Sequence, residues 1–167
     1  SRFSEGGLLP ETYHYTYGDS RTDILRRMQK GMTKILNDLW DKRKSNLPFK
    51  TPREAVILAS IIEKETGVSS ERGRVAAVFV NRLRKGMRLQ SDPTVIYGIT
   101  RGTRPLGRPL LHTDLKKFSK YNTYTIRGLP PGPIANPGRA SIIAALNPPE
   151  TREFYFVSNG NGGHSFS

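Results

Sequence analysis

Two glutamates at the end of an apolar helical segment, Glu63 and Glu65, have the residue type and spacing that most directly suggest chemistry. At about 100° per residue, Glu65 falls at the centre of the apolar face formed by Ile57, Leu58, Ile61 and Ile62. A carboxylate on a buried face is costly unless it is paired or functional, and desolvation raises its pKa. Because a general acid at neutral pH needs a raised pKa, the pattern predicts Glu65 as a catalytic carboxylate.

The same helical phase separates the two glutamates. Glu63 falls on the side of Val56 and Ala59, so we expect it to be structural or to support the catalytic carboxylate. The alternative for Glu65 is that the helix emerges from the core at its last turn, where the carboxylate would simply meet solvent or an arginine.

Other chemistry is poorly represented in the sequence. His14, His112 and His164 are scattered without metal-ligand spacing, which favours surface or packing roles. The absence of cysteine excludes disulfides, thiol catalysis and Cys-based zinc sites, and neither a nucleophile-elbow motif nor a phosphate loop is present. The sequence therefore predicts no metal and no cofactor.

Three helices are predicted in the first half of the chain. The central one starts at the capping box Thr51-Pro52-Arg53-Glu54, includes both glutamates and stops near Gly67. A helix from the cap Ser20 to about Lys44 precedes it, and a helix over about 71–85, capped by Ser69 or Ser70, follows it.

Shorter elements are predicted in the second half, where Pro and Gly are frequent. They comprise a helical turn from Asp92 through Tyr97, an exposed loop over 100–109, a strand over 122–126, a rigid segment over 129–134, a helix over about 138–146, and a hairpin joining 154–157 to 165–166. Helices followed by short strands indicate an α+β protein.

Length and composition limit the number of domains and the kinds of partner that the chain could have. The 167 residues suffice for one domain with its own core, and the formal net charge of +13 suits nucleic acid, an anionic membrane surface or an acidic polymer equally. No apolar run approaches the ~20 residues of a membrane span. We expect the chain to be one domain, residues 1–167, of a longer protein.

Several sequence blocks resemble the endolytic murein transglycosylases, the YceG-like family, in the same order along nearly the whole chain. The blocks are Glu5-Gly6 with Leu9-Pro10-Glu11-Thr12-Tyr13, Ala59-Ser60-Ile61-Ile62-Glu63-Lys64-Glu65-Thr66, Asn81-Arg82-Leu83, Met87-Arg88-Leu89-Gln90-Ser91-Asp92-Pro93-Thr94-Val95-Ile96-Tyr97-Gly98, Tyr121-Asn122-Thr123-Tyr124, Gly128-Leu129-Pro130-Pro131-Gly132-Pro133-Ile134, and Phe154-Tyr155-Phe156-Val157 with Gly162-Gly163-His164-Ser165-Phe166. The resemblance implies a helical lysozyme-like core around the catalytic helix with a small mixed β portion. It also implies that Glu65 is the catalytic residue, in agreement with the helical phase.

The resemblance further implies a lytic reaction that cuts peptidoglycan glycan strands internally and leaves 1,6-anhydro-N-acetylmuramic acid ends. Family members face the periplasm from the bacterial inner membrane, so an anchor and a LysM-like region are expected upstream. Partners would be glycan strands and peptidoglycan synthesis enzymes, without nucleic acid, and membrane contact would run only through the anchor.

Polar residues in the family-like blocks are the candidates for substrate contacts: Gln90, Ser91, Asp92, Asn122 and Tyr124. A cap or turn role before Pro93 is the alternative for Asp92. Three other functions stay open at this point. A lysozyme-type hydrolase would need a second carboxylate, for which Glu63 and Asp92 are candidates, while a glycan-binding domain or a basic nucleic-acid module would need no catalytic residue.

Overall fold

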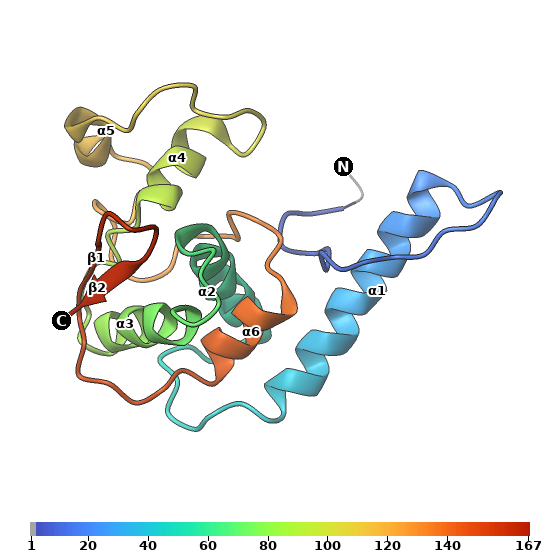
Figure 1. The fold of residues 1–167 in the computed structure, drawn as a ribbon, viewed down its shortest axis with the longest axis horizontal. Helices are drawn as coiled ribbons and strands as arrows, with labels where there is room; N and C mark the ends of the chain where they lie inside the picture. The colour runs from blue at the N-terminus through green and yellow to red at the C-terminus, as the bar shows by residue number, and fades with distance from the viewer. Residues whose placement is uncertain (1–2) are drawn as a thin grey trace.

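Six helices and one two-stranded sheet make up residues 3–167, the part of the chain described by the computed structural model. In Figure 1, α2, α3, α4 and α6 form one body, with the hairpin beside α3 and with α1 reaching away from it. The elements are α1 (Arg21–Trp40), α2 (Pro52–Glu65), α3 (Arg72–Arg84), α4 (Asp92–Thr100), α5 (His112–Lys116), α6 (Arg139–Leu146), β1 (Phe156–Ser158) and β2 (His164–Phe166).

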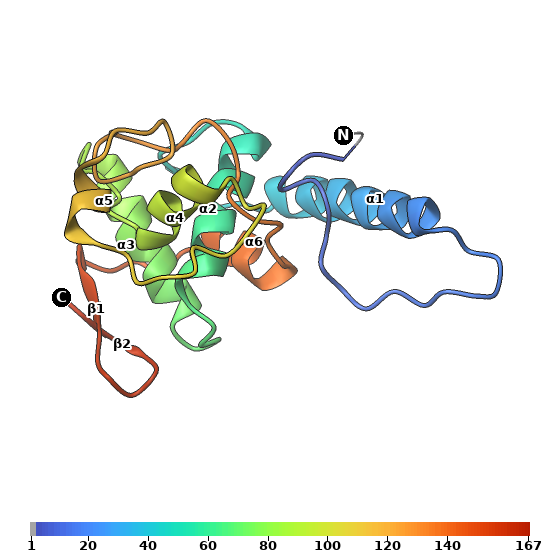
Figure 2. The ribbon, with the colours of Figure 1, turned by 90° about the horizontal axis from the view of Figure 1, so that it is seen from above.

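The predicted α+β class is confirmed, with helix as the dominant element. The β portion is smaller and simpler than the expected mixed one. Within residues 3–167 it is a single antiparallel hairpin, with Phe156 opposite Phe166 and Ser158 opposite His164. Figure 2 shows this hairpin projecting from the helical body at the end far from α1.

Helix α2 is the centre of the core. The predicted capping box is present, since the Thr51 hydroxyl accepts from the Glu54 amide and the Glu54 carboxylate accepts from the Thr51 amide. Every residue from Ala55 to Ile62 is buried. The helix packs against α1, α3, α4 and α6, so its position in the fold is fixed from several sides.

Two polar side chains of α2 anchor the segment that leads into α6. Ser60 is fully buried, and its hydroxyl donates to the Ile57 carbonyl and accepts from the Ile134 amide at 3.0 Å. The Glu63 carboxylate accepts from the Gly138 amide at 3.0 Å and from the Ser141 hydroxyl at 2.6 Å. Glu63 therefore caps the N-terminus of α6, a structural role that the sequence analysis had left open.

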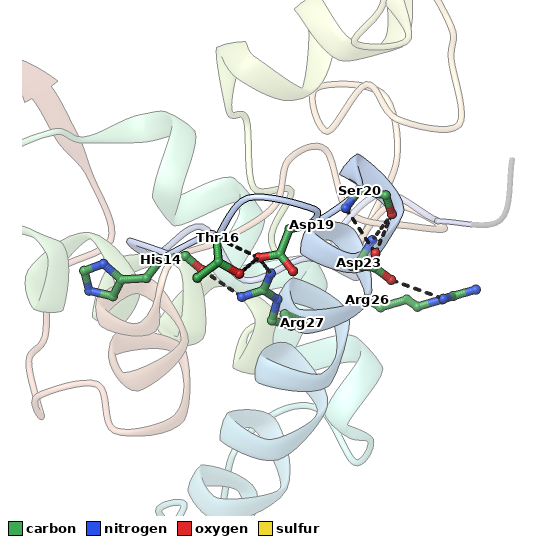
Figure 3. A network of polar contacts seen from close by, with 7 residues as sticks. All are labelled: His14, Thr16, Asp19, Ser20, Asp23, Arg26 and Arg27. Carbon is green, nitrogen blue, oxygen red and sulfur yellow. Dashed lines mark hydrogen bonds and ion pairs between the residues drawn. The ribbon is translucent and has the colours of Figure 1, made fainter.

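Helix α1 is fixed at both ends by different means. At its start the expected capping box joins Ser20 and Asp23, and Arg27 donates to the His14 carbonyl at 2.7 Å and to Asp19 at 2.6 Å (Figure 3). Toward its end Met32 and Ile35 are buried in the core. The helix ends at Trp40, a turn earlier than expected.

Two sequence predictions about elements were wrong. The segment 122–126 forms tight turns rather than a strand, because the Asn122 carbonyl accepts from the amides of Thr125 and Ile126. Helix α3 begins after Glu71, which makes no side-chain cap bond, instead of after Ser69 or Ser70. Helix α5, within a stretch where no element was expected, starts where Asp114 accepts from the Leu111 amide at 2.9 Å.

Candidate active site

A cavity of about 250 Å³ lies at the C-terminal end of α2 and gathers side chains from five regions of the chain. Glu65 comes from α2, Arg82 from α3, Asp92 from the start of α4, Tyr124 from the turns of 122–126, and His164 from the hairpin. Its lining residues are Glu65, Arg82, Leu89, Gln90, Asp92, Tyr124, Phe156, Ser158 and His164. Three of the predicted substrate-contact residues, Gln90, Asp92 and Tyr124, therefore line the same cavity as the predicted catalytic carboxylate.

Glu65 is the last residue of α2, where Thr66 turns the backbone to an extended conformation and ends the helix. Its side chain is half-buried. Burial raises the pKa of the Glu65 carboxyl to about 7, with a smaller raising contribution from the negative charge of Asp92, while a hydrogen bond from Ser91 and the charge of His164 act to lower it. At neutral pH a large share of Glu65 is thus protonated and able to donate.

Ser91 is fully buried, and its hydroxyl donates to Glu65 Oε2 at 3.0 Å. Its backbone is held by two buried threonines, because Thr123 Oγ1 accepts from the Ser91 amide and the Thr94 hydroxyl donates to the Ser91 carbonyl. Ser91 was predicted to contact substrate. In the structure the Ser91 hydroxyl contacts one oxygen of the Glu65 carboxyl group, and its contact with substrate stays a prediction.

Asp92 and Tyr124 form a polar pair on the cavity wall. The Tyr124 hydroxyl donates to Asp92 Oδ1 at 2.7 Å, and burial followed by this bond raises the pKa of the Tyr124 hydroxyl well above its usual value. Tyr124 therefore stays protonated and acts as a donor. Asp92 is exposed and is the second carboxylate of the cavity.

Arg82 also lines the cavity, a position that the sequence analysis did not predict. Arg82 is buried, with 6% of its surface exposed, and its guanidinium donates to the carbonyls of Phe154, Arg88 and Leu89, and to Gln90 Oε1 at 3.1 Å. It joins α3 to the segment before α4 and to the segment before β1. Gln90 itself has a φ of 53°, an uncommon left-handed conformation for a residue other than glycine.

His164 is a second residue whose place in the site was not expected. The Glu71 carboxylate accepts from the His164 amide at 2.9 Å and lies 2.8 Å from the ring Nδ1. The ring meets Phe156 edge-on, with centroids 5.2 Å apart. This double contact fixes the imidazole on the cavity wall, whereas the sequence analysis had predicted a surface or packing role.

Two predicted site residues lie elsewhere. Glu63 caps α6 and does not line the cavity. Asn122 is 1% exposed, and its amide nitrogen donates to the carbonyls of Leu115 and Lys117 at 3.0 and 2.7 Å while its oxygen accepts from the Tyr124 amide. The geometry thus gives Asn122 a supporting role behind Tyr124.

Two further features bear on what the site could hold. Within residues 3–167, no three His, Asp or Glu side chains are grouped so that they could hold a metal ion. The helices of that same range also contain none that is both long enough and apolar enough to span a bilayer.

Two bacterial proteins are similar in sequence to the chain over most of its length. It is 39% identical over 159 residues to the endolytic murein transglycosylase of Bacillus subtilis (strain 168), a match that covers 95% of this chain and 42% of the relative. It is 32% identical over 165 residues to the endolytic murein transglycosylase of Streptococcus pneumoniae serotype 2 (strain D39), which covers 95% of this chain and 29% of the relative. The chain therefore spans less than half the length of these curated relatives.

A solved structure shares the fold. The crystal structure of a YceG-like protein from Listeria monocytogenes superposes with a TM-score of 0.80 at 37% sequence identity, over 97% of this chain and 52% of that one. The YceG-like family matches residues 1–167. These matches confirm the resemblance that the sequence blocks indicated, and the chain belongs to the YceG-like family.

Proposed function

We propose that this domain is an endolytic peptidoglycan lytic transglycosylase. It cleaves the β-1,4 bond between N-acetylmuramic acid and N-acetylglucosamine inside glycan strands, with Glu65 as general acid and then general base. The observation that carries the proposal is the Glu65 carboxyl, held in a cavity with its pKa raised to about 7. The names of two relatives, each an endolytic murein transglycosylase, support the same activity.

The chemistry needs one carboxyl group. Protonated Glu65 donates its proton to the glycosidic oxygen as the bond from that oxygen to C1 of the muramic acid breaks. The resulting carboxylate then accepts the proton of the C6 hydroxyl, whose oxygen bonds to C1 and closes the 1,6-anhydro ring. Glu65 ends the cycle protonated, the N-acetylglucosamine side leaves with a free 4-hydroxyl, and no water is consumed.

The neighbours of Glu65 have separate parts in this proposal. Ser91 holds one oxygen of the carboxyl group, so that the other faces the cavity. Gln90, Asp92 and Tyr124 line the cavity with amide, carboxylate and hydroxyl groups that suit the hydroxyl and acetamido groups of a sugar. Their contact with substrate is part of the proposal, while Asn122 supports Tyr124 from behind.

The proposal extends to the protein around the site. A lysozyme-like helical core is supported by a buried central helix that ends in the catalytic carboxyl. We further propose that residues 1–167 are the single catalytic domain of a longer protein, anchored in the bacterial inner membrane with this domain in the periplasm. The shares of 42% and 29% that the chain covers of its relatives leave room for such further parts. Peptidoglycan synthesis enzymes are the proposed partners.

Mass spectrometry of the products from purified peptidoglycan strands tests the activity. Wild type should produce anhydromuramyl ends, and Glu65→Gln should lower the rate by about 10²–10⁴-fold, the usual contribution of a general acid–base group. Glu63→Gln is the matched control, because it makes the same change two residues away on a side chain that caps α6. It should retain the wild-type product and rate.

Other products would point to other functions. Reducing ends, heavier by one water, would indicate a muramidase, and Asp92 in the same cavity would then be the second carboxylate. Strand binding by both proteins without cleavage by either would indicate a glycan-binding domain. Undiminished cleavage by Glu65→Gln would remove Glu65 from the mechanism.

A further inference from the structure

A second and larger groove adjoins the cavity of Glu65. It has a volume of about 800 Å³ and lies between α4, the loop 102–108 and the segment 134–136. Its lining includes Lys64, Pro93, Ile96, Tyr97, Arg104 and Ile134. The transglycosylase mechanism above makes no use of this groove.

Chain connectivity shows that the two hollows are neighbours. Glu65 and Asp92 line the smaller cavity, while the residues next to them in sequence, Lys64 and Pro93, line the larger groove. Consecutive Cα atoms are only about 3.8 Å apart. The end of α2 and the start of α4 therefore form a shared boundary between the two hollows.

The sizes of the hollows suit different parts of one substrate. Ligand pockets in proteins generally measure about 300–1,000 Å³, so a cavity of about 250 Å³ holds little more than the sugar at the cleavage point. An enzyme that cuts inside a strand must accommodate material on either side of the broken bond. The groove of about 800 Å³ provides that space next to the catalytic carboxyl.

The groove combines an apolar floor with positive charge. Pro93, Ile96, Tyr97 and Ile134 supply apolar surface. Lys64 and Arg104 are exposed, and neither forms an ion pair with any residue in 3–167. One carboxylate, Glu5, also lies in the groove, where it accepts from the Tyr97 hydroxyl at 3.5 Å.

The loop that carries Arg104 is held at both ends. On one side Arg101 adopts a φ of 54° and its guanidinium lies 4.9 Å from the centre of the Tyr121 ring. On the other side Arg108 donates two hydrogen bonds to Asp114, at 2.7 and 3.0 Å. A wall fixed before binding loses little conformational entropy on binding, so Arg104 is placed to act as a recognition residue.

We propose that this groove binds the peptide stem carried by a muramic acid next to the cleavage point, with Lys64 and Arg104 pairing with carboxylates of the stem. The inference rests on the proposed function, because it takes peptidoglycan as the substrate class. Stem peptides combine short apolar side chains with free carboxylates, which matches a groove lined by apolar residues and by two cations that form no ion pair within residues 3–167. The domain therefore prefers stem-bearing strands to strands without peptide.

Binding rather than cleavage is the appropriate test, since it is independent of the reaction. The Glu65→Gln protein is titrated with fluorescently labelled glycan strands that carry stems, and with the same strands after an amidase has removed the stems. We expect about three- to tenfold tighter binding of the stem-bearing strands, the scale of two partly exposed ion pairs. Added salt should reduce that preference, because exposed charges are screened.

Substitutions in the groove then test whether Lys64 and Arg104 cause the preference for stem-bearing strands. Adding Lys64→Gln and Arg104→Gln to Glu65→Gln should abolish it and leave the affinity for stem-free strands unchanged. The charge-matched control adds Arg21→Gln and Lys30→Gln, which remove an arginine and a lysine from the exposed surface of α1. Those changes should leave the preference intact.

The outcomes separate this inference from the proposed function. Equal affinity for both kinds of strand, or a preference that the control removes as fully as the groove variant does, would overturn the inference even if wild type produces anhydro ends. A preference lost only in the groove variant would support it, even if the cleaved ends proved to be hydrolytic.

Discussion

The pKa of Glu65 is set by neighbours that act in opposite directions. Burial, the largest cause, and the charge of Asp92 raise it, while the Ser91 hydrogen bond and the charge of His164 lower it. The value of about 7 is thus a balance that one substitution can move either way. General acid catalysis depends on the protonated form, so activity should fall as pH rises through this value.

Substitutions of Asp92 and Ser91 should shift the alkaline limb of the pH–rate profile in opposite directions. Asp92→Asn removes a like charge but keeps an acceptor for Tyr124, so the Glu65 pKa falls and activity is lost at a lower pH. Ser91→Ala removes a bond that stabilises the carboxylate, so the pKa rises and activity persists to a higher pH. We expect shifts of about 0.5–1 pH unit in the pH–rate profile.

The product distinguishes this role of Asp92 from that of a second catalytic carboxylate. Asp92→Asn should still release anhydro ends at a pH below the shifted limb. Complete loss of activity at every pH, with normal folding by circular dichroism, would mean that Asp92 does more than contact the sugar and raise the pKa of Glu65. It would favour a mechanism with two carboxylates.

The sequence analysis identified site residues that a local sequence pattern indicates. It missed site residues whose contacts are with distant segments of the chain. Glu65 could be selected because helical phase alone places it on the apolar face of α2. Arg82 and His164 could not, because their partners are distant in the chain: Phe154 is 72 residues from Arg82, and Glu71 is 93 from His164. Such pairs become visible only when the tertiary structure brings the segments together.

The same distinction holds for the secondary-structure elements. Both capping boxes, at Ser20 and Thr51, were predicted because each is closed within three residues. The segment 122–126 was predicted as a strand because polar and apolar residues alternate there. Its actual shape depends on the Asn122 side chain, which bonds to carbonyls five and seven residues earlier.

This dependence predicts a structural effect for Asn122→Ala. The change leaves the carbonyls of Leu115 and Lys117 without their donor and opens a gap at a site that is 1% exposed. We expect unfolding free energy to fall by about 2–3 kcal/mol, measured by denaturant titration. The control Asn161→Ala, in the exposed turn of the hairpin, should be neutral. Unchanged stability of Asn122→Ala together with weaker strand cleavage would restore it as a substrate-contact residue.

At the scale of the whole molecule, the site exists only when five parts of the chain are folded together. Helix α2 provides the carboxyl, α3 provides Arg82, the start of α4 provides Asp92, the turns of 122–126 provide Tyr124, and the C-terminal hairpin provides His164. The hydrogen bond from buried Arg82 to the Phe154 carbonyl and the ion pair of Arg74 with Glu153 join α3 to the segment before the hairpin. Activity and global stability are consequently linked through the same contacts.

The ionisable groups predict how global stability depends on pH. Asp23, Glu54, Glu71 and Asp114 have lowered pKa values, chiefly through hydrogen bonds, so the stability they contribute is present above their unfolded pKa and is lost as pH falls through the folded values. Glu65 has a raised pKa, so its contribution to stability depends on pH in the opposite direction. That contribution is fully present below the unfolded-state pKa of 4.5 and is lost as pH rises through the folded-state pKa of about 7.

Stability should therefore be greatest in mildly acidic solution and decline toward pH 8. The decline attributable to Glu65 is at most about 3.5 kcal/mol, because its pKa rises from 4.5 to about 7 and each pKa unit corresponds to about 1.4 kcal/mol. Unfolding free energies measured by urea titration between pH 5 and pH 8.5 at constant ionic strength should show it in wild type. Glu65→Gln should lack this part of the decline, so its unfolding free energy relative to that of wild type should increase as pH rises. A difference in unfolding free energy that stays constant over this range would mean that Glu65 titrates at its ordinary pKa. The carboxyl would then lack the property on which the proposed acid catalysis depends.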